Sequence, residues 1–306
     1  MQGKNRKFKF GEQLTAKGEL IRSALISGPG IGWVTVFLLV PLVFILVISF
    51  CGRGTYGEIE WQFTLENFKR FIGFGSFGFD PLYPKIILRS FLMAGGTVLF
   101  CVLAAMPLTF FIAGLPRNRK LLGLMLLLIP FWTNMLIRTY AWQVLLSSNS
   151  WFSKVAVALG FLEPGDGLYP SAFAVFLAMT ANYLPFLALP LYASVEKVDW
   201  SLVDAAKDLG ANGWRVFRHA LLPQIKPGLS AGMLLVFIPA TGEFVIPNLL
   251  GGSKTMLLGS AIGMQFGQSR DWPFGSAIAC LGMLTVMIGL WVFARTAGEE
   301  GRESML

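Results

Sequence analysis

An acidic residue within an apolar run is the first feature of this chain that indicates chemistry. Glu243, together with Pro239, interrupts the apolar stretch 227–246. If that stretch crosses a bilayer, a carboxylate there costs several kcal/mol unless it is paired or faces water, so Glu243 is a candidate functional residue. The alternative is that Glu243 pairs with Arg138 and only holds two spans together. Both interpretations stay open at this point, and they are compatible.

A polar segment between two apolar runs, residues 201–223, is the second feature that indicates function. Ser201 is expected to cap a short helix, with Asp204 as the acid of a capping box and Gly210 ending the helix in the left-handed conformation. Asn212 is expected to cap a second helix, which must end near Pro223 because proline donates no backbone hydrogen bond. The segment therefore predicts two short helices joined by a tight turn.

Residues for catalysis are not indicated. The sequence contains no GxxxxGK[ST] motif, so the chain cannot supply a phosphate-binding loop. Its single histidine, His219, lies in the polar segment, which leaves no Ser/His pair or metal cluster in the apolar runs. Cys51, Cys101 and Cys280 show no CxxC spacing. We expect no catalytic residue, no metal and no cofactor bound by this chain.

The elements that position these residues are long and apolar. Of the 306 residues, 55% are hydrophobic and 14% are charged, against about a quarter charged in a soluble domain. About 20 apolar residues cross a membrane, and unpaired backbone groups in lipid force such segments to be helical. The sequence predicts an all-α membrane protein with about six transmembrane helices, over 24–50, 90–115, 121–137, 170–195, 227–246 and 272–294.

The distribution of Lys and Arg predicts the orientation. Segments 1–23, 116–120, 196–226 and 295–306 carry 16 of the 25 basic residues. The positive-inside rule then places both termini in the cytoplasm, and the first apolar run is too long for a cleaved signal peptide. We expect a cytoplasmic basic segment at 1–23, a membrane domain at 24–294 that contains the 201–223 loop, and a cytoplasmic tail at 295–306. The net charge of +8 follows from this topology and from anionic lipid, so nucleic-acid binding is not indicated.

The polar segment resembles a known family signature. Asp204-Ala205-Ala206, Gly210 and Leu222-Pro223 match the cytoplasmic EAA loop of ABC-importer permeases, Glu-Ala-Ala-x3-Gly-x9-Ile-x-Leu-Pro. Asp204 replaces the glutamate and Ala220 the isoleucine; the first keeps the charge and the second trims one apolar contact. The resemblance implies that this loop forms coupling helices, which dock into a groove of the ATPase subunit.

Four further blocks extend the resemblance to the spermidine/putrescine permeases, over roughly residues 60–290. They are PFWTN with LIR at 130–138, YLPF with LPLY at 183–192, VFIPA with GEFV at 236–245, and RDWP at 270–273. A polyamine is a multivalent cation, and its path needs carboxylates and aromatic faces. The resemblance thus implies a substrate path that includes Trp132, Asn134, Arg138, Tyr183, Glu243, Asp271 and Trp272.

The resemblance also implies partners and a location. The fold would be that of a type I-like ABC importer permease in the bacterial inner membrane. The chain would form half of a permease pair, with two ATPase subunits that use ATP and Mg²⁺, and with a soluble substrate-binding protein outside. Transport would proceed by alternating access. The alternatives are a permease for another small solute, or a stand-alone secondary transporter, which would need internal repeats that the sequence does not show.

Overall fold

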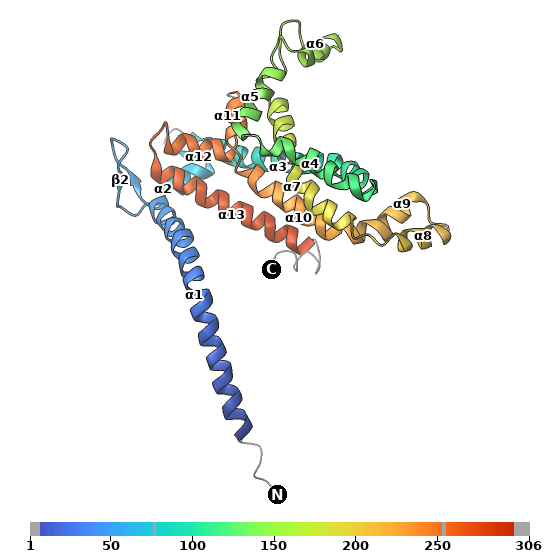
Figure 1. The fold of residues 1–306 in the computed structure, drawn as a ribbon. Helices are drawn as coiled ribbons and strands as arrows, with labels where there is room; N and C mark the ends of the chain where they lie inside the picture. The colour runs from blue at the N-terminus through green and yellow to red at the C-terminus, as the bar shows by residue number, and fades with distance from the viewer. Residues whose placement is uncertain (1–6, 76–77, 253–254, 297–306) are drawn as a thin grey trace.

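A computed structural model describes residues 7–75, 78–252 and 255–296 of the chain. Five helices are long and apolar enough to cross a membrane, and the number rises to six if one bent pair is a single span. This confirms the prediction of an all-α membrane protein with about six spans. Figure 1 shows a bundle of long helices from which the first helix runs away.

The helices that contain the candidate spans are long and mostly unbroken. They are α1 (Lys7–Ser49), α3 (Leu82–Gly114), α7 (Ala172–Val195), α10 (Leu222–Thr241) and α13 (Trp272–Thr296). The other helices break or connect the spans: α2 (Glu66–Ile72), α4 (Arg117–Trp132), α5 (Met135–Leu145), α6 (Trp151–Ala158), α8 (Trp200–Asp208), α9 (Gly213–Val216), the π-helix η1 (Phe217–Leu221), α11 (Val245–Leu250) and α12 (Leu258–Phe266). Two small antiparallel ladders pair β1 (Gly52–Arg53) with β2 (Ile59–Glu60), and β3 (Phe74–Gly75) with β4 (Gly78–Phe79).

The centre of the bundle consists of α3, α7 and α10, and α7 packs against both of the others (Figure 1). Small residues on α7, such as Ala174 and Ala178, are fully buried, and so are Leu187 and Leu191. Small side chains let helix backbones approach closely, which is the usual means of helix association in lipid. The faces of the helices turned away from this centre carry exposed apolar side chains, as a lipid-facing surface requires.

The closest approach in the bundle depends on glycine. A Cβ atom built on Gly228 of α10 would overlap the Ser194 hydroxyl and the Pro190 carbonyl oxygen of α7. A Cβ on Gly232 would lie 2.9 Å from the Leu187 carbonyl oxygen. Both glycines therefore lie where α7 and α10 are in direct contact.

We predict that Gly228→Ala lowers the amount of folded protein in the membrane. The added methyl group must push α10 away from α7, and overpacking of this kind costs about 1–3 kcal/mol. Gly95→Ala on α3 is the matched control, since a Cβ there would meet nothing within 4 Å. The measurement is the thermal unfolding midpoint in detergent together with membrane abundance. Equal midpoints for the two variants would contradict the close packing.

The first helix has few neighbours within the chain. α1 packs mainly against α13, close to its C-terminal end, where Ile48 and Ser49 are buried. Large apolar side chains along its middle, such as Trp33 and Phe37, are exposed. Figure 1 shows the rest of α1 leaving the bundle. The predicted first span is thus one part of a longer helix.

The third span is not a straight helix, which corrects the prediction of one helix over 121–137. α4 ends at Trp132, α5 begins at Met135, and the two are bent by 88°. Thr133 is extended, and the Asn134 side chain accepts the Leu136 N–H at 2.8 Å, which starts the second helix. The local hydrogen-bonding of asparagine therefore overrides the continuous apolar pattern.

The fifth span also differs from its predicted limits. Its helix begins at Gly213 rather than near Pro227 and runs through α9, η1 and α10 to Thr241. It stops before Glu243, so this acid lies in a break between α10 and α11 rather than inside a helix. Pro239, which the pattern placed as a second interruption, lies within α10.

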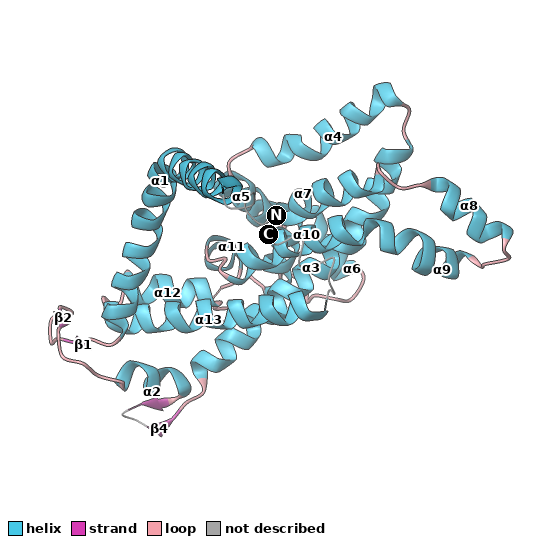
Figure 2. Ribbon diagram, turned by 90° about the horizontal axis from the view of Figure 1, so that it is seen from below, coloured by secondary structure: helices cyan, strands magenta, loops and turns pink. Residues whose placement is uncertain are grey.

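The two ends of the bundle carry different connections. α8 and α9 project at one end, and α2 with the small ladders lies at the opposite end, as Figure 2 shows.

Candidate functional site

The break between α10 and α11 holds the Glu243 carboxylate in a network of hydrogen bonds. Its Oε1 accepts backbone N–H groups of Phe244, Val245 and Ile246 at 3.1, 2.9 and 3.4 Å. These are the donors that the start of a helix leaves unpaired, and a negative charge there is favoured by the helix dipole. Glu243 thus caps α11, a local role that its position after Gly242 permits.

The second oxygen of the same carboxylate faces another span. Tyr183 of α7 donates its hydroxyl to Glu243 Oε2 at 2.5 Å. Both side chains are buried, with Glu243 only 6% exposed. Among the described residues, Glu243 has no ion-pair partner. The structure therefore joins two of the predicted path residues and leaves the negative charge without a counter-charge.

Arg138 does not pair with Glu243, so the alternative raised from the sequence is not what the structure shows. Its Nη1 donates to the Pro130 carbonyl oxygen at 3.0 Å, and its guanidinium lies 5.6 Å from the centre of the Phe131 ring. The C-terminal carbonyls of α4 are without helical partners, and a cation near them is favourable. Arg138 thus stabilises the bend between α4 and α5.

Asp271 lies in a different environment from Glu243. It is 1% exposed, and its Oδ2 lies 2.8 Å from Arg70 Nη1 and 3.7 Å from Arg53 Nη1. Its Oδ1 accepts the Phe274 N–H at 3.2 Å, which caps α13. The sequence placed Asp271 in the substrate path, whereas its contacts are those of a residue that fastens the 51–81 segment to α13.

We predict that Arg70→Met destabilises the protein, because Asp271 would keep only the longer contact to Arg53. Breaking a buried ion pair costs about 3–5 kcal/mol. Since the Arg70 side chain is about half exposed, we expect about 1–2 kcal/mol. Thermal unfolding in detergent measures it, with Lys69→Met on the same helix as a control that removes the same charge. If both variants unfold at the wild-type temperature, the ion pair does not hold this segment.

The other predicted path residues lie in two further places. Trp132 is 82% exposed at the end of α4, and Asn134 is used as the cap of α5. Trp272 is partly exposed and meets the edge of Phe266. Tyr183 and Glu243 are thus the two predicted path residues that the structure joins by a hydrogen bond between spans.

The polar segment 201–223 forms the predicted helix, turn and helix. α8 ends at Asp208, and Gly210 follows it in the left-handed conformation, with a φ of +77°. The Gly210 N–H bonds the Lys207 carbonyl oxygen at 2.8 Å and the Ala211 N–H bonds that of Ala206 at 3.1 Å, the pattern of a Schellman motif. Asn212 accepts the Arg215 N–H at 2.9 Å, which confirms it as the cap of the second helix.

The start of α8 differs from the prediction. Asp199, not Ser201, is the cap: its Oδ1 accepts the hydroxyl and the N–H of Ser201 at 2.7 and 2.9 Å. These bonds hold the pKa of Asp199 below its ordinary value, so their contribution is present at neutral pH and lost in acid. Asp204 is not a capping-box acid; it lies 2.9 Å from Lys207, and this exposed pair adds little stability.

The second helix does not end near Pro223, which corrects a further prediction. It passes through the π-helix η1 into α10, so the loop and the fifth span are one continuous helical element. Pro223 is the second residue of α10, directly after the π-helix, so its missing N–H falls where the regular α-helical hydrogen bonding is already interrupted. Leu222 is half-buried and packs against the core cluster of the bundle.

The exposed surface of this loop carries large apolar side chains among its charged ones. Ala206 is half-buried and packs on the core, whereas Ala205 is exposed. Leu209 is 88% exposed, and Trp200 and Trp214 are also exposed. Sequence reasoning missed these three residues, although large apolar side chains among the charges of a polar loop are a readable signal. Exposed apolar groups of this kind indicate a protein-binding surface.

Comparison with known proteins decides the family. Residues 106–296 match the family described as binding-protein-dependent transport system inner membrane component. The chain belongs to this family. The matched range contains α7, the Glu243 break, α13 and the polar segment 201–223 with its Gly210 turn.

Two curated relatives of this transport family are similar over most of the chain. The spermidine/putrescine transport system permease protein PotB of Escherichia coli (strain K12) is 37% identical over 260 residues, which are 85% of this chain and 91% of that protein. The protein of the same name from Haemophilus influenzae is 37% identical over 262 residues, covering 85% of this chain and 88% of the relative. The chain is therefore a transport permease and a multi-pass membrane protein.

Solved structures agree on the fold. A bacterial ABC transporter involved in the import of the acidic polysaccharide alginate superposes with a TM-score of 0.66 at 15% identity, over 96% of this chain and 99% of that chain. The same kind of transporter in complex with an alginate-pentasaccharide-bound periplasmic protein gives a TM-score of 0.62 at 15% identity, over 95% and 96%. The helices of this permease thus have the arrangement of an ABC importer.

Proposed function

We propose that this chain forms half of the translocation path of an ATP-driven importer for polyamines such as spermidine or putrescine. The observation that carries the proposal is the Glu243 carboxylate, which is buried between two spans, held by Tyr183, and not ion-paired within the described part of the chain. Such a group attracts a cation. The 37% identity to permeases named for spermidine and putrescine supports the same solute.

The polar segment 201–223 supports a second part of the proposal, that a partner subunit drives transport with ATP. Ala205, Leu209 and Trp214 present an apolar surface on a loop whose second helix continues into α10. A displacement of this loop by a bound partner would therefore move α10, the helix of the fifth span, with it. Two ATPase subunits, which bind ATP and Mg²⁺, would cause that displacement. This chain itself would perform no chemistry. Trp132, Asp271 and Trp272 would reach the solute only in another conformation or beside the second permease subunit.

The proposed orientation follows from charge. Residues 1–23, 116–120, 196–226 (which contains the 201–223 loop) and the 295–306 tail would lie in the cytoplasm, because together they hold 16 of the 25 basic residues. The membrane domain would span 24–294. The opposite end, with α2 and the ladders, would then face the soluble substrate-binding protein. Residues 1–6 and 297–306 lie outside the described residues.

Co-expression with the candidate ATPase, second permease and binding protein tests the function. We expect the four proteins to purify together, and vesicles that contain them to accumulate radiolabelled spermidine or putrescine only with ATP inside. Uptake of another solute in preference to polyamines would show a different importer of the same family. Uptake without any nucleotide-binding partner would show a secondary transporter instead.

A further inference from the structure

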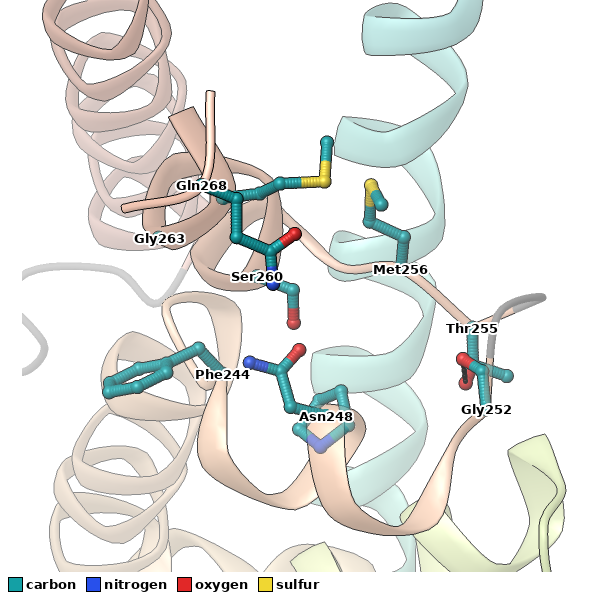
Figure 3. A pocket seen from close by; sticks show the side chains of 10 residues that line it. Phe244, Asn248, Gly252, Thr255, Met256, Ser260, Gly263 and Gln268 are labelled. Carbon is teal, nitrogen blue, oxygen red and sulfur yellow. Dashed lines mark hydrogen bonds between the residues drawn. The ribbon is translucent and has the colours of Figure 1, made fainter. Parts of the chain in front are cut away.

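A pocket of about 470 Å³ lies beside the Glu243 break, between α11, α12 and the turn that follows α12. Figure 3 shows Asn248 from α11, Ser260 from α12 and Gln268 from the turn converging on it. Sequence reasoning assigned no role to these three residues. None of the described side chains that line the pocket is charged.

Ser260 is the residue that marks the pocket as a binding site. Its side chain is 94% buried, and its Oγ has no hydrogen-bond partner. Buried hydroxyls elsewhere in the spans, such as those of Thr97 and Thr139, bond the carbonyl four residues earlier in their own helix. Ser260 stands in the first turn of α12, where no such carbonyl precedes it. An unpaired buried hydroxyl costs about 1–3 kcal/mol, so it is expected to have a ligand in some state.

The chemistry around Ser260 suits a protonated amine. Figure 3 shows the Ser260 hydroxyl directed toward the Asn248 amide, with the Gln268 amide on its other side. An ammonium group has three donors, and these side chains offer neutral oxygen acceptors. Phe244 lines the same pocket and adds an aromatic ring that attracts a cation, while Met256 adds apolar contact for a methylene chain.

The pocket and the carboxylate share a wall. Phe244 lines the pocket, and its backbone N–H bonds Glu243. A Cβ on Gly259 of α12 would overlap the Gly242 carbonyl oxygen and lie 3.0 Å from that of Glu243. The start of α12 therefore packs directly on the break between α10 and α11, one residue before Ser260.

We propose that this pocket is a second binding site for an amine group of the solute, without a charged side chain among its described lining residues, next to the Glu243 carboxylate. The inference rests on the proposed function, because it assigns a further site for the same cation. Neutral oxygens hold an ammonium group more weakly than a carboxylate does, which lets the solute leave the site during transport. A chain with several amines can contact the pocket and Glu243 at once.

Serine-to-alanine variants test the proposed amine-binding site in the complete reconstituted transporter. Ser260→Ala is expected to raise the concentration for half-maximal polyamine uptake roughly tenfold or more, because one hydrogen bond to a charged donor is lost. Ser276→Ala is the matched control: its Oγ is also buried without a partner, but it does not line the pocket. Both variants should keep wild-type abundance, since alanine removes an unpaired polar group. If the two give the same uptake as wild type, the pocket does not bind the solute.

Charge at the exposed Asn248 gives a second test that does not depend on a buried position. Asn248→Asp adds a carboxylate of the same shape, so it should lower the half-maximal concentration and slow maximal uptake. Asn248→Lys should raise the half-maximal concentration by tenfold or more through repulsion. Equal effects of both variants would contradict a cation site and would indicate that a neighbouring subunit covers this face. If the wild-type complex takes up no polyamine at all, the proposed function itself is wrong, which separates the two failures.

Discussion

Leu209→Glu is expected to abolish ATP-driven uptake while the chain stays folded in the membrane. Leu209 is 88% exposed at the tip of α8, so the substitution disturbs no internal contact. If the tip docks into an ATPase groove, a buried charge replaces a buried apolar side chain in the complex. Loss of such an interface anchor costs about 2 kcal/mol or more, roughly a thirtyfold weaker association.

Two measurements separate docking from folding in this variant. Co-purification of the ATPase subunit and ATP hydrolysis stimulated by the loaded binding protein should both fall, whereas membrane abundance and thermal midpoint should not. Lys197→Glu is the control, since it also adds an acid at an exposed position near the same end of the bundle. Retention of stimulated hydrolysis by Leu209→Glu would remove the docking assignment from this loop.

Glu243→Gln is expected to lower polyamine uptake by roughly 5- to 150-fold, the equivalent of about 1–3 kcal/mol for a lost charge contact. Glutamine keeps an oxygen to accept the N–H groups of Phe244, Val245 and Ile246. Its amide N–H₂ can donate to the Tyr183 oxygen, so the link to α7 is retained in reversed direction. Only the negative charge disappears. Abundance and basal ATP hydrolysis are therefore expected to stay at the wild-type level.

Comparison with other variants shows whether the charge or the cap matters. Glu243→Ala loses the cap of α11 and should reduce abundance as well as uptake. Glu163→Gln, in an exposed loop, is a control for the same chemical change and should transport normally. The Arg138 guanidinium bonds Pro130, so a compensating change at Arg138 is not expected to restore uptake. Normal uptake by Glu243→Gln would exclude the carboxylate from the solute path.

Features that depend on a few neighbouring residues could be predicted from the sequence. The number of spans follows from the length of the apolar runs, because backbone groups in lipid must be hydrogen-bonded within the segment and a helix does this. The Gly210 turn and the Asn212 cap follow from local backbone chemistry, and the structure confirms both. The family could also be predicted, because the motif from Asp204 to Pro223 is defined by spacing along the chain and does not depend on tertiary contacts.

Local rules failed where two of them competed. Asp199 and Ser201 are both good caps, and the sequence alone does not say which begins α8. Pro223 was expected to stop a helix, yet it lies directly after the π-helix η1, inside one continuous helical element. The apolar run 121–137 predicted one straight span, but the Asn134 cap starts a new helix.

Contacts between distant residues were decided only by the tertiary structure. Tyr183 and Glu243 are 60 residues apart, and Arg70 and Asp271 are 201 residues apart. Both acids looked alike in the sequence, each beside an apolar run and near aromatic residues. Packing gave Asp271 an arginine and Glu243 only neutral donors, since the spans that carry these groups meet through helix contacts such as the one at Gly228. The sequence by itself determined which groups lie in the membrane, and the arrangement of the helices determined which acid keeps an unpaired charge.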